Sequence, residues 1–310
     1  LQVIFFAIFF GITLVMLPEE KKKPVVDFIH SINEVFLKMV NMVMLAAPFF
    51  VFALLAGVIA KMADTPGEVF EIFLGLGSYS ITLLVGLFFL VFVFYPVIIK
   101  IFVPKLTYKE FFRNISPAQF LAFSTSSSAA TLPVTMECVE DNMGVSKNVS
   151  SFVLPVGATV NMDGTSLYQA VAALFIAQAY GMDLSLATQF MIVITAVLTS
   201  IGVASIPAAS LVAITVILAA IGLPAEAIGL ILVTDRLLDM FRTSVNVVGD
   251  SSVTVLMAKL EGEDLRFMSE KEDAHDPGRG FEGRLDEGPR PVEAGVIETE
   301  AKDARDNAGA

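Results

Sequence analysis

The residues best suited to chemistry lie on one stretch, TDRLLDMFRTSVNVVGD, from Thr234 to Asp250. At roughly 100° per residue, its main polar side chains share about a third of one helix circumference. These residues are Asp235, Asp239, Arg242, Thr243, Asn246 and Asp250. The flanking residues 228–233 and 253–257 are apolar enough for a bilayer, where an ionised side chain costs on the order of 3 kcal/mol or more unless it faces a partner or a wet cavity. We therefore expect this polar stripe to line a site.

Two roles are open for Asp239 and Arg242, which lie three residues apart and so share a helix face. They could form an internal ion pair that leaves nothing for a ligand. Alternatively, Asp239 could bind an α-ammonium group and Arg242 a side-chain carboxylate by bidentate pairing. Thr243 and Asn246 would then offer donors to an α-carboxylate. A ligand with one amine and two carboxylates, such as aspartate or glutamate, fits the second role.

A second polar motif, NMDGT at 161–165, interrupts an otherwise apolar segment. Asn161 and Asp163 lie beside a glycine that would permit local unwinding. Hard cations such as Na⁺ prefer carboxylate and carbonyl oxygens, which an unwound turn supplies. We predict a cation site here, completed by Asn246 and Asp250.

Composition places the chain in a membrane. Of 310 residues, 55% are hydrophobic and 17% are charged, against about 25% charged in soluble domains. The net charge of −12 belongs mostly to residues 261–310, which hold 15 acidic and 7 basic residues. No basic patch supports nucleic-acid binding. The single cysteine, Cys138, excludes an intrachain disulfide and a cysteine metal cluster.

The first half of the chain reads as membrane helices. Apolar segments at 1–17, 25–60 and 69–103 are expected helices, and the abrupt apolar start suggests that earlier helices precede this chain. Lys and Arg gather at 18–27 and 100–113 but not at 61–68, which places the first two regions on the cytoplasmic side.

The second half of the chain has a different pattern. Two pairs of short apolar segments meet at small-residue tips, STSSSAATLP at 124–133 and SIGVASIPAAS at 200–210. A long segment carrying polar residues follows each pair. This pattern is typical of an inverted-repeat transporter with re-entrant hairpins and broken helices. Half-helix N-termini at such tips suit a carboxylate ligand.

Four motifs in order make the resemblance specific: TSSSAATLP, LPVGATVNMDGTSLYQ, TSIGVASIPAAS and DRLLDMFRTSVNVVGD. Over about residues 1–259 the chain resembles the dicarboxylate/amino acid:cation symporter family, the glutamate transporter homologues. The resemblance implies an all-α integral membrane fold with two re-entrant helical hairpins and broken transmembrane helices in inverted repeats. It implies a homotrimer in the lipid bilayer of the cell membrane, in which a transport domain slides against a scaffold.

The resemblance also assigns the domains. Residues 1–60 would be the end of the fourth helix and the fifth helix, both scaffold. Residues 69–260 would be the transport domain: the sixth helix, hairpin 1 at about 108–145, the seventh helix at about 148–181, hairpin 2 at about 184–222 and the eighth helix at about 225–260. Residues 261–310 would be an acidic, disordered cytoplasmic tail.

Site residues follow from the same resemblance. The implied substrate-binding residues are Ser127, Ser128, Thr165, Ile206, Ala209, Ser210, Asp239, Arg242, Thr243 and Asn246. One Na⁺ would use Gly157, Asn161, Asn246 and Asp250, and a second would use backbone carbonyls of Thr159, Ser200, Ile201 and Val203. Asp163 would help hold a third Na⁺, whose other ligands lie on the missing third helix. No cofactor other than the coupling ion Na⁺ is implied.

The leading hypothesis is Na⁺-coupled symport of aspartate or glutamate. Having both Asp239 and Arg242 favours an acidic amino acid, because relatives for neutral amino acids lack the arginine and C4-dicarboxylate relatives lack the aspartate. The second tip departs from the family in Ser205 and Ser210, where many relatives have glycine. The alternatives are a proton-coupled glutamate or C4-dicarboxylate symporter and, in another class, a ligand-gated channel or receptor. An enzyme is least favoured, since no nucleophile–base pair is evident.

Overall fold

The computed structural model describes residues 2–265 and 267, and every regular element in them is helical. The first half of the chain forms α1 (Gln2–Val15), α2 (Glu19–Met62), α3 (Pro66–Phe89), a π-helical turn η1 (Leu90–Phe94) and α4 (Tyr95–Phe102). The second half forms α5 (Tyr108–Thr125), α6 (Ser128–Asp141), α7 (Lys147–Val160), α8 (Asp163–Ala179), α9 (Leu186–Ser200), α10 (Ala209–Ala220), a 3₁₀ turn η2 (Ala225–Leu230) and α11 (Leu232–Leu260).

Hydroxyl side chains mark the starts of most of the helices that build the site. The Thr107 hydroxyl accepts a hydrogen bond from the Glu110 amide, and the Glu110 carboxylate accepts one from the Thr107 amide, which together form a capping box that begins α5. Ser127, Ser146 and Ser185 cap α6, α7 and α9 in the same way, each accepting from an amide three residues on. These caps satisfy amides that have no partner inside the helix.

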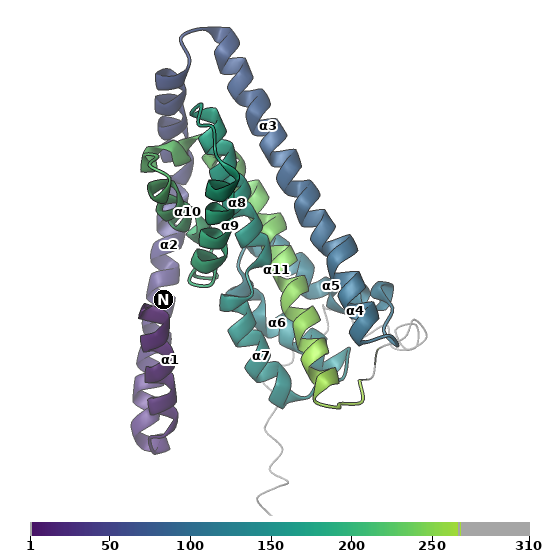
Figure 1. The fold of residues 1–310 in the computed structure, drawn as a ribbon. Helices are drawn as coiled ribbons and strands as arrows, with labels where there is room; N and C mark the ends of the chain where they lie inside the picture. Colours follow the sequence, from purple (N-terminus) through teal and green to yellow (C-terminus); the bar gives the residue numbers. More distant parts are fainter. Residues whose placement is uncertain (1, 266, 268–310) are drawn as a thin grey trace, which may run out of the picture. The chain divides into compact units, whose positions relative to one another are not determined.

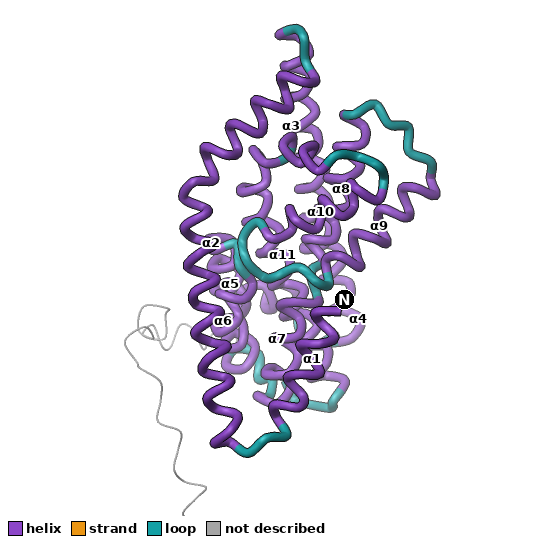
Figure 2. Tube along the Cα trace, turned by 90° about the vertical axis from the view of Figure 1, so that its left-hand side faces the viewer, coloured by secondary structure: helices purple, strands orange, loops and turns teal. Residues whose placement is uncertain are grey.

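Helices α5 to α8 pack around a central helix, α11, and α9 and α10 pack against α8 (Figures 1 and 2). The shared core includes Leu83, Phe111, Leu154, Val248 and Val255, each fully or almost fully buried. Helices α5 with α6, and α9 with α10, form two antiparallel hairpins. The polar stripe of α11 thus lies inside the bundle, where its charges require partners.

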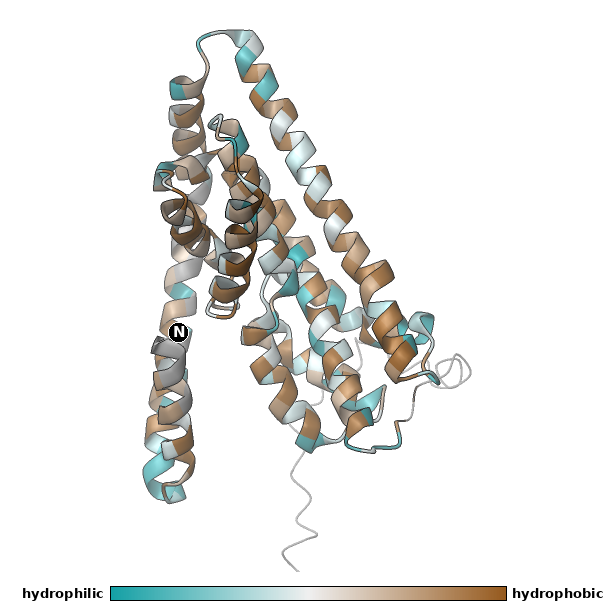
Figure 3. Cartoon of the chain, viewed as in Figure 1, coloured by the Kyte–Doolittle hydropathy of each residue, from teal (hydrophilic) through white to brown (hydrophobic). Residues whose placement is uncertain are grey.

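Large apolar side chains cover much of the outside. Leu45, Phe49, Phe120 and Leu186 are each at least 74% exposed, and apolar residues dominate α9 and α10 (Figure 3). Among the described residues, Pro66–Phe102 is the one helical segment long and apolar enough to cross a membrane by length and composition. Shorter apolar helices are Pro48–Met62, Leu186–Ser200 and Ala209–Ala220. An exposed apolar surface of this extent suits contact with lipid.

Three expected boundaries are wrong. The loop expected at 18–27 is mostly helix, because α2 begins at Glu19, where two glutamates suit a helix N-terminus and the Lys21 and Lys22 amides bond to the Pro18 carbonyl. The interruption expected at 161–165 is confined to Asn161 and Met162. The third is the start of the tail, which was expected at residue 261.

The first residues of that expected tail are folded. After α11 the chain turns at Gly262, whose φ is 85°, and Leu265 and Phe267 pack against the core. The Ser146 amide donates to Glu263 Oε2 at 2.9 Å. The remainder of the expected acidic tail, from 268 to 310, lies outside the described residues.

Candidate functional site

The two hairpin tips meet each other and the break in the α7–α8 segment. Ser126 ends α5 in the left-handed region, with φ 53°, and Ala208 precedes α10 with φ 62°. The Ser127 hydroxyl donates to the Ser205 carbonyl at 2.7 Å. The Ser205 hydroxyl in turn donates to the Ala158 carbonyl in the last turn of α7. The two tips therefore contact each other, with Ser127 and Ser205 buried between them.

Arg242 forms the centre of the charged cluster. Its Nη2 atom lies 2.7 Å from Asp239 Oδ1 and 3.2 Å from Asp235 Oδ1. Its guanidinium carbon lies 3.6 Å from the ring centroid of Tyr168, whose hydroxyl donates to Asp235 Oδ1 at 2.6 Å. The structure thus contains the internal ion pair that was one of the two roles considered.

The ion pair does not satisfy the guanidinium. Arg242 is 0% exposed, and its Nε and Nη1 atoms have no acceptor among the described residues. Asp239 Oδ2 also accepts a hydrogen bond from the Ala208 amide at 3.1 Å, so the second tip contacts the same carboxylate. A buried guanidinium with free donors is costly, so this site favours a further anionic or polar group.

Asn246 holds α8 against α11. Its Oδ1 accepts from the Gly164 amide at 2.9 Å, and its Nδ2 donates to the Thr165 hydroxyl at 3.2 Å. Gly164 lies within α8, so its role is not the unwinding expected from the sequence. A Cβ there would lie 2.8 Å from the Arg242 carbonyl oxygen, and glycine permits this close approach of the two helices.

A space of about 20 Å³ lies between the tips, α8 and α11. Most of the predicted substrate-binding residues line it: Ser128, Thr165, Ile206, Ser210, Asp239, Thr243 and Asn246. Ser127, Ala209 and Arg242 do not line it, although Ser127 bonds to the second tip and Arg242 bonds to Asp239. The structure therefore gathers seven of the ten predicted substrate-binding residues around one small space.

Part of the first predicted cation set also comes together. Asn161 Nδ2 donates to Asp250 Oδ1 at 3.0 Å, and a Cβ on Gly157 would lie 2.8 Å from that same oxygen. Asn246, the fourth member, is bonded instead to Gly164 and Thr165. A buried carboxylate beside an amide and a helix C-terminus supplies the oxygen chemistry that Na⁺ requires.

The second cation set is only partly brought together. The Ser200 hydroxyl lies 2.6 Å from that of Ser166 on α8, and Val203 packs with Met162 at the break. The Ser200 carbonyl accepts the Val203 amide at 3.2 Å. Ile201 caps α9, and Thr159 is exposed on α7, with its hydroxyl on the Val156 carbonyl. The tip thus contacts the helix break through Val203 and the first turn of α8 through Ser200.

Two functional candidates, Tyr95 and Tyr168, were absent from the sequence predictions, and a third, Asp235, was placed on the polar stripe but was given no binding role. Asp235 and Tyr168 orient Arg242, and Tyr95 donates to Asp163 Oδ2 at 2.5 Å. Helical periodicity placed Asp235 on the stripe seven residues before Arg242, and the structure adds its ion pair with Arg242. Tyr95 and Tyr168 come from other helices and gave no signal along the sequence.

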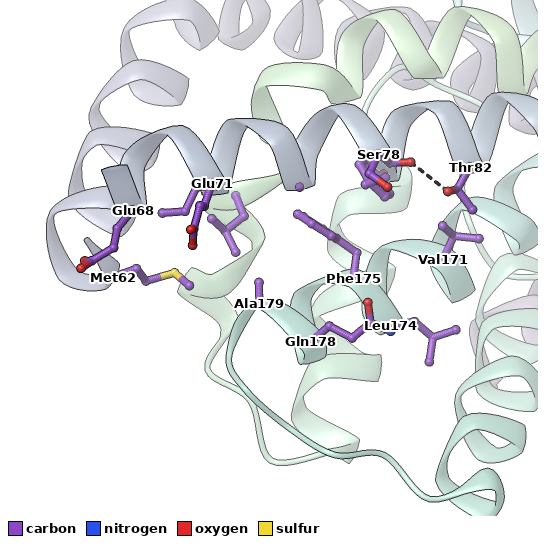
Figure 4. A pocket seen from close by; sticks show the side chains of 14 residues that line it. Met62, Glu68, Glu71, Ser78, Thr82, Val171, Leu174, Phe175, Gln178 and Ala179 are labelled. Carbon is purple, nitrogen blue, oxygen red and sulfur yellow. Dashed lines mark hydrogen bonds between the residues drawn. The ribbon is translucent and has the colours of Figure 1, made fainter. Parts of the chain in front are cut away.

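A larger cavity, of about 630 Å³, lies elsewhere, between α3 and α8 (Figure 4). Glu68 and Glu71 line it from α3, and Phe175 and Gln178 line it from α8. In its wall the Thr82 hydroxyl donates to the Ser78 carbonyl at 2.8 Å. No residue predicted to bind substrate or Na⁺ lines this cavity, so it is separate from the candidate site.

An all-helical bundle with buried charges around two hairpin tips has the features of a membrane carrier, and comparison with known proteins gives the family. Residues 1–260 match the Sodium:dicarboxylate symporter family, so the chain belongs to that family. It is 44% identical over 276 residues to excitatory amino acid transporter 2 of Rattus norvegicus, covering 89% of this chain and 47% of that protein.

Other relatives give the same result. Excitatory amino acid transporter 3 of Oryctolagus cuniculus is 43% identical over 268 residues, covering 86% of this chain and 50% of that protein. An excitatory amino acid transporter of Caenorhabditis elegans is 41% identical over 276 residues, covering 89% and 52%. The chain thus spans about half the length of the curated relatives it matches.

Proposed function

We propose that this protein is a secondary active transporter that moves an acidic amino acid, aspartate or glutamate, across the cell membrane together with Na⁺. The observation that carries the proposal is the completely buried Arg242, which keeps two nitrogens without acceptors and is paired with Asp239, the carboxylate that the second tip contacts. Membership in the symporter family and similarity to excitatory amino acid transporters support the same substrate class.

Charge exchange is the proposed basis of substrate binding. The ligand's ammonium group takes the place of the guanidinium at Asp239, and its side-chain carboxylate takes the place of Asp239 at Arg242. Thr243 and Asn246 contact the α-carboxylate. A ligand carrying both charges replaces the Asp239–Arg242 pair with two new pairs, and its α-carboxylate is the one charge that meets only neutral donors. A purely cationic or purely anionic ligand would leave one side uncompensated, which disfavours it.

The charge balance of the site supports cation coupling. The part of the chain that forms the site holds four carboxylates and one buried arginine, Arg242. The carboxylates are those of Asp163, Asp235, Asp239 and Asp250. A bound acidic amino acid adds a further net negative charge. In a low-dielectric interior this excess is unfavourable unless cations enter with the substrate. Na⁺ at Asp250 and at Asp163 would provide the compensation.

The proposed movement follows the family. Hairpins α5–α6 and α9–α10 are re-entrant and related as inverted repeats, and they form a transport domain over 69–260 that slides against a scaffold over 1–60. The second tip serves as the outer gate, with Ile206, Ala209 and Ser210 against the substrate. The protein is a multi-pass homotrimer with its C-terminal tail in the cytoplasm. It is a transporter and not an enzyme.

Uptake into liposomes tests the proposal. The protein, expressed in full and reconstituted, should accumulate labelled aspartate or glutamate when Na⁺ is outside and no pH gradient exists. Accumulation driven by a proton gradient without Na⁺ would instead favour the proton-coupled alternative. Flux that never exceeds the external substrate concentration under a Na⁺ gradient would favour a channel. Arg236→Cys, an exposed arginine on the same helix, is the control for Arg242→Cys.

A further inference from the structure

A phenol from outside the predicted set contacts the Asp163 carboxylate. Tyr95 is 2% exposed, and its hydroxyl donates to Asp163 Oδ2 at 2.5 Å. Tyr95 is the first residue of α4, and Asp163 is the first residue of α8. This hydrogen bond therefore fixes the helix break to the long apolar segment that ends at Phe102.

The backbone before Tyr95 explains how the phenol reaches this position. Pro96 has no amide hydrogen, and its ring would clash with the preceding turn of a regular helix. The turn η1 widens instead, and the Tyr95 amide bonds to the Leu90 carbonyl five residues back. One extra residue in a turn rotates the following side chains by roughly 100°.

The widened turn leaves one carbonyl without a backbone donor. The Val91 carbonyl would normally accept from Tyr95, which bonds to Leu90 instead, and Pro96 has nothing to donate. The hydroxyl of Tyr108, on α5, donates to the Val91 carbonyl. Tyr108 therefore stabilises the π turn from outside, and the turn in turn determines where Tyr95 points.

The Tyr95 hydroxyl also lies against α11. A Cβ on Gly249 would overlap it and would come within 2.9 Å of Asn161 Nδ2. The next residue is Asp250, whose Oδ1 accepts from Asn161. The phenol thus lies close to both carboxylates of the predicted cation sites. Among the described residues neither carboxylate has an ion-pair partner.

We propose that Tyr95 is a positioning residue for Na⁺ binding at Asp163, a proposal that rests on the proposed function. Its hydroxyl holds Oδ2, while Oδ1 accepts no hydrogen bond from the side chains and loops described. One oxygen is thereby oriented and the other is left for the cation. Hydrogen bonds that orient a metal's ligands typically change metal affinity by about 10- to 100-fold.

Tyr95→Phe tests this role, with Tyr79→Phe as the matched control. Tyr79 is on the same apolar segment and is 3% exposed, and its hydroxyl has no hydrogen-bond partner among the described residues. In the purified protein expressed in full, Tyr95→Phe should raise the Na⁺ concentration for half-maximal aspartate binding by roughly tenfold. Aspartate affinity at saturating Na⁺ should stay within about twofold of the control.

A second readout omits the substrate. The rise in melting temperature caused by Na⁺ alone should need more Na⁺ in Tyr95→Phe than in Tyr79→Phe. Tyr108→Phe, which removes the donor to Val91, should shift the Na⁺ dependence in the same direction by a smaller factor. Tyr108→Phe also supplies the test if Tyr95→Phe does not fold, since Tyr108→Phe leaves the Tyr95 phenol in place.

The outcomes are separable. The positioning role is wrong if the Na⁺ concentration for half-saturation in Tyr95→Phe stays within twofold of that in Tyr79→Phe. Where Tyr95→Phe does not fold, the same limit applies to Tyr108→Phe. In either case the proposed transport function stands. If the unsubstituted protein binds aspartate equally well without Na⁺, the proposed function itself is wrong.

Discussion

Asp239 and Arg242, one turn apart on α11, are joined by a 2.7 Å contact between Oδ1 and Nη2. Asp239 at the same time accepts the Ala208 amide of the second tip on its other oxygen. The carboxylate expected to bind a substrate amine thus links the only arginine buried in the described bundle to the second hairpin tip. Displacing the guanidinium from Asp239 therefore also changes the environment of the tip.

Arg242→Cys should abolish high-affinity binding of acidic amino acids, raising the dissociation constant of aspartate at least thirtyfold. Losing one partner of a buried charge pair costs about 2–5 kcal/mol. Titration calorimetry in Na⁺ measures the effect, and Arg236→Cys should bind as the unsubstituted protein does. Unchanged aspartate binding in Arg242→Cys would mean that the arginine is purely structural.

Tyr168→Phe should weaken aspartate binding without altering the Na⁺ dependence. The ring stays under the guanidinium, but the donor to Asp235 Oδ1 at 2.6 Å is lost. Hydrogen bonds to charged groups contribute about 1.5–3 kcal/mol. A double-mutant cycle with Asp235→Asn should give a coupling energy in this range. Tyr180→Phe, at the end of the same helix, is the control, and additive effects of the pair would contradict the assigned contact.

Gly157→Ala should raise the Na⁺ concentration needed for half-maximal uptake. The new Cβ would lie 2.8 Å from Asp250 Oδ1, too close for the carboxylate to keep its place. Gly77→Ala is the matched control, because a Cβ there meets nothing within 4 Å. Equal Na⁺ dependence in the two variants would remove Gly157 and Asp250 from the cation site.

Ala208→Gly should increase thermal stability. Ala208 adopts a φ of 62°, a region that costs a residue with a Cβ roughly 1–2 kcal/mol. Glycine removes that cost, but it also gives the unfolded chain more conformational entropy, which opposes folding. The net stabilisation should therefore be about 0.5–1 kcal/mol. Ala209→Gly, within the first turn of α10, should lower the melting temperature instead. A lower melting temperature in Ala208→Gly would show that the tip is not strained at this residue.

Local sequence patterns predicted the elements whose cause is local. The two hairpins follow from small-residue tips between short apolar segments, and the α7–α8 break follows from NMDGT. The start of α2 was missed because Pro24 suggested a loop, although the glutamates before it suit a helix N-terminus. Residues from 261 onward were assigned to a tail because their acidic composition outweighed two apolar residues, Leu265 and Phe267, which pack against the core.

Features that depend on tertiary contacts could not be predicted. Pro96 signals a disturbed helix, but the π turn also depends on the Tyr108 hydroxyl, which comes from another helix. The stripe on α11 left the internal pair and the ligand-binding role equally open. Only the fold reveals that Arg242 pairs with Asp239 and Asp235 and still retains unsatisfied donors.

The two-residue break between Val160 and Asp163 brings the carboxyl end of one helix next to the amino end of another. Partial charges of opposite sign therefore lie a few residues apart, negative at the end of α7 and positive at the start of α8. In the proposed transport function, a cation at the first and an anion at the second would attract one another across the protein interior, so each would tighten the other's binding. Thermodynamic linkage between the two solutes is then a property of the backbone itself, before any side chain is considered.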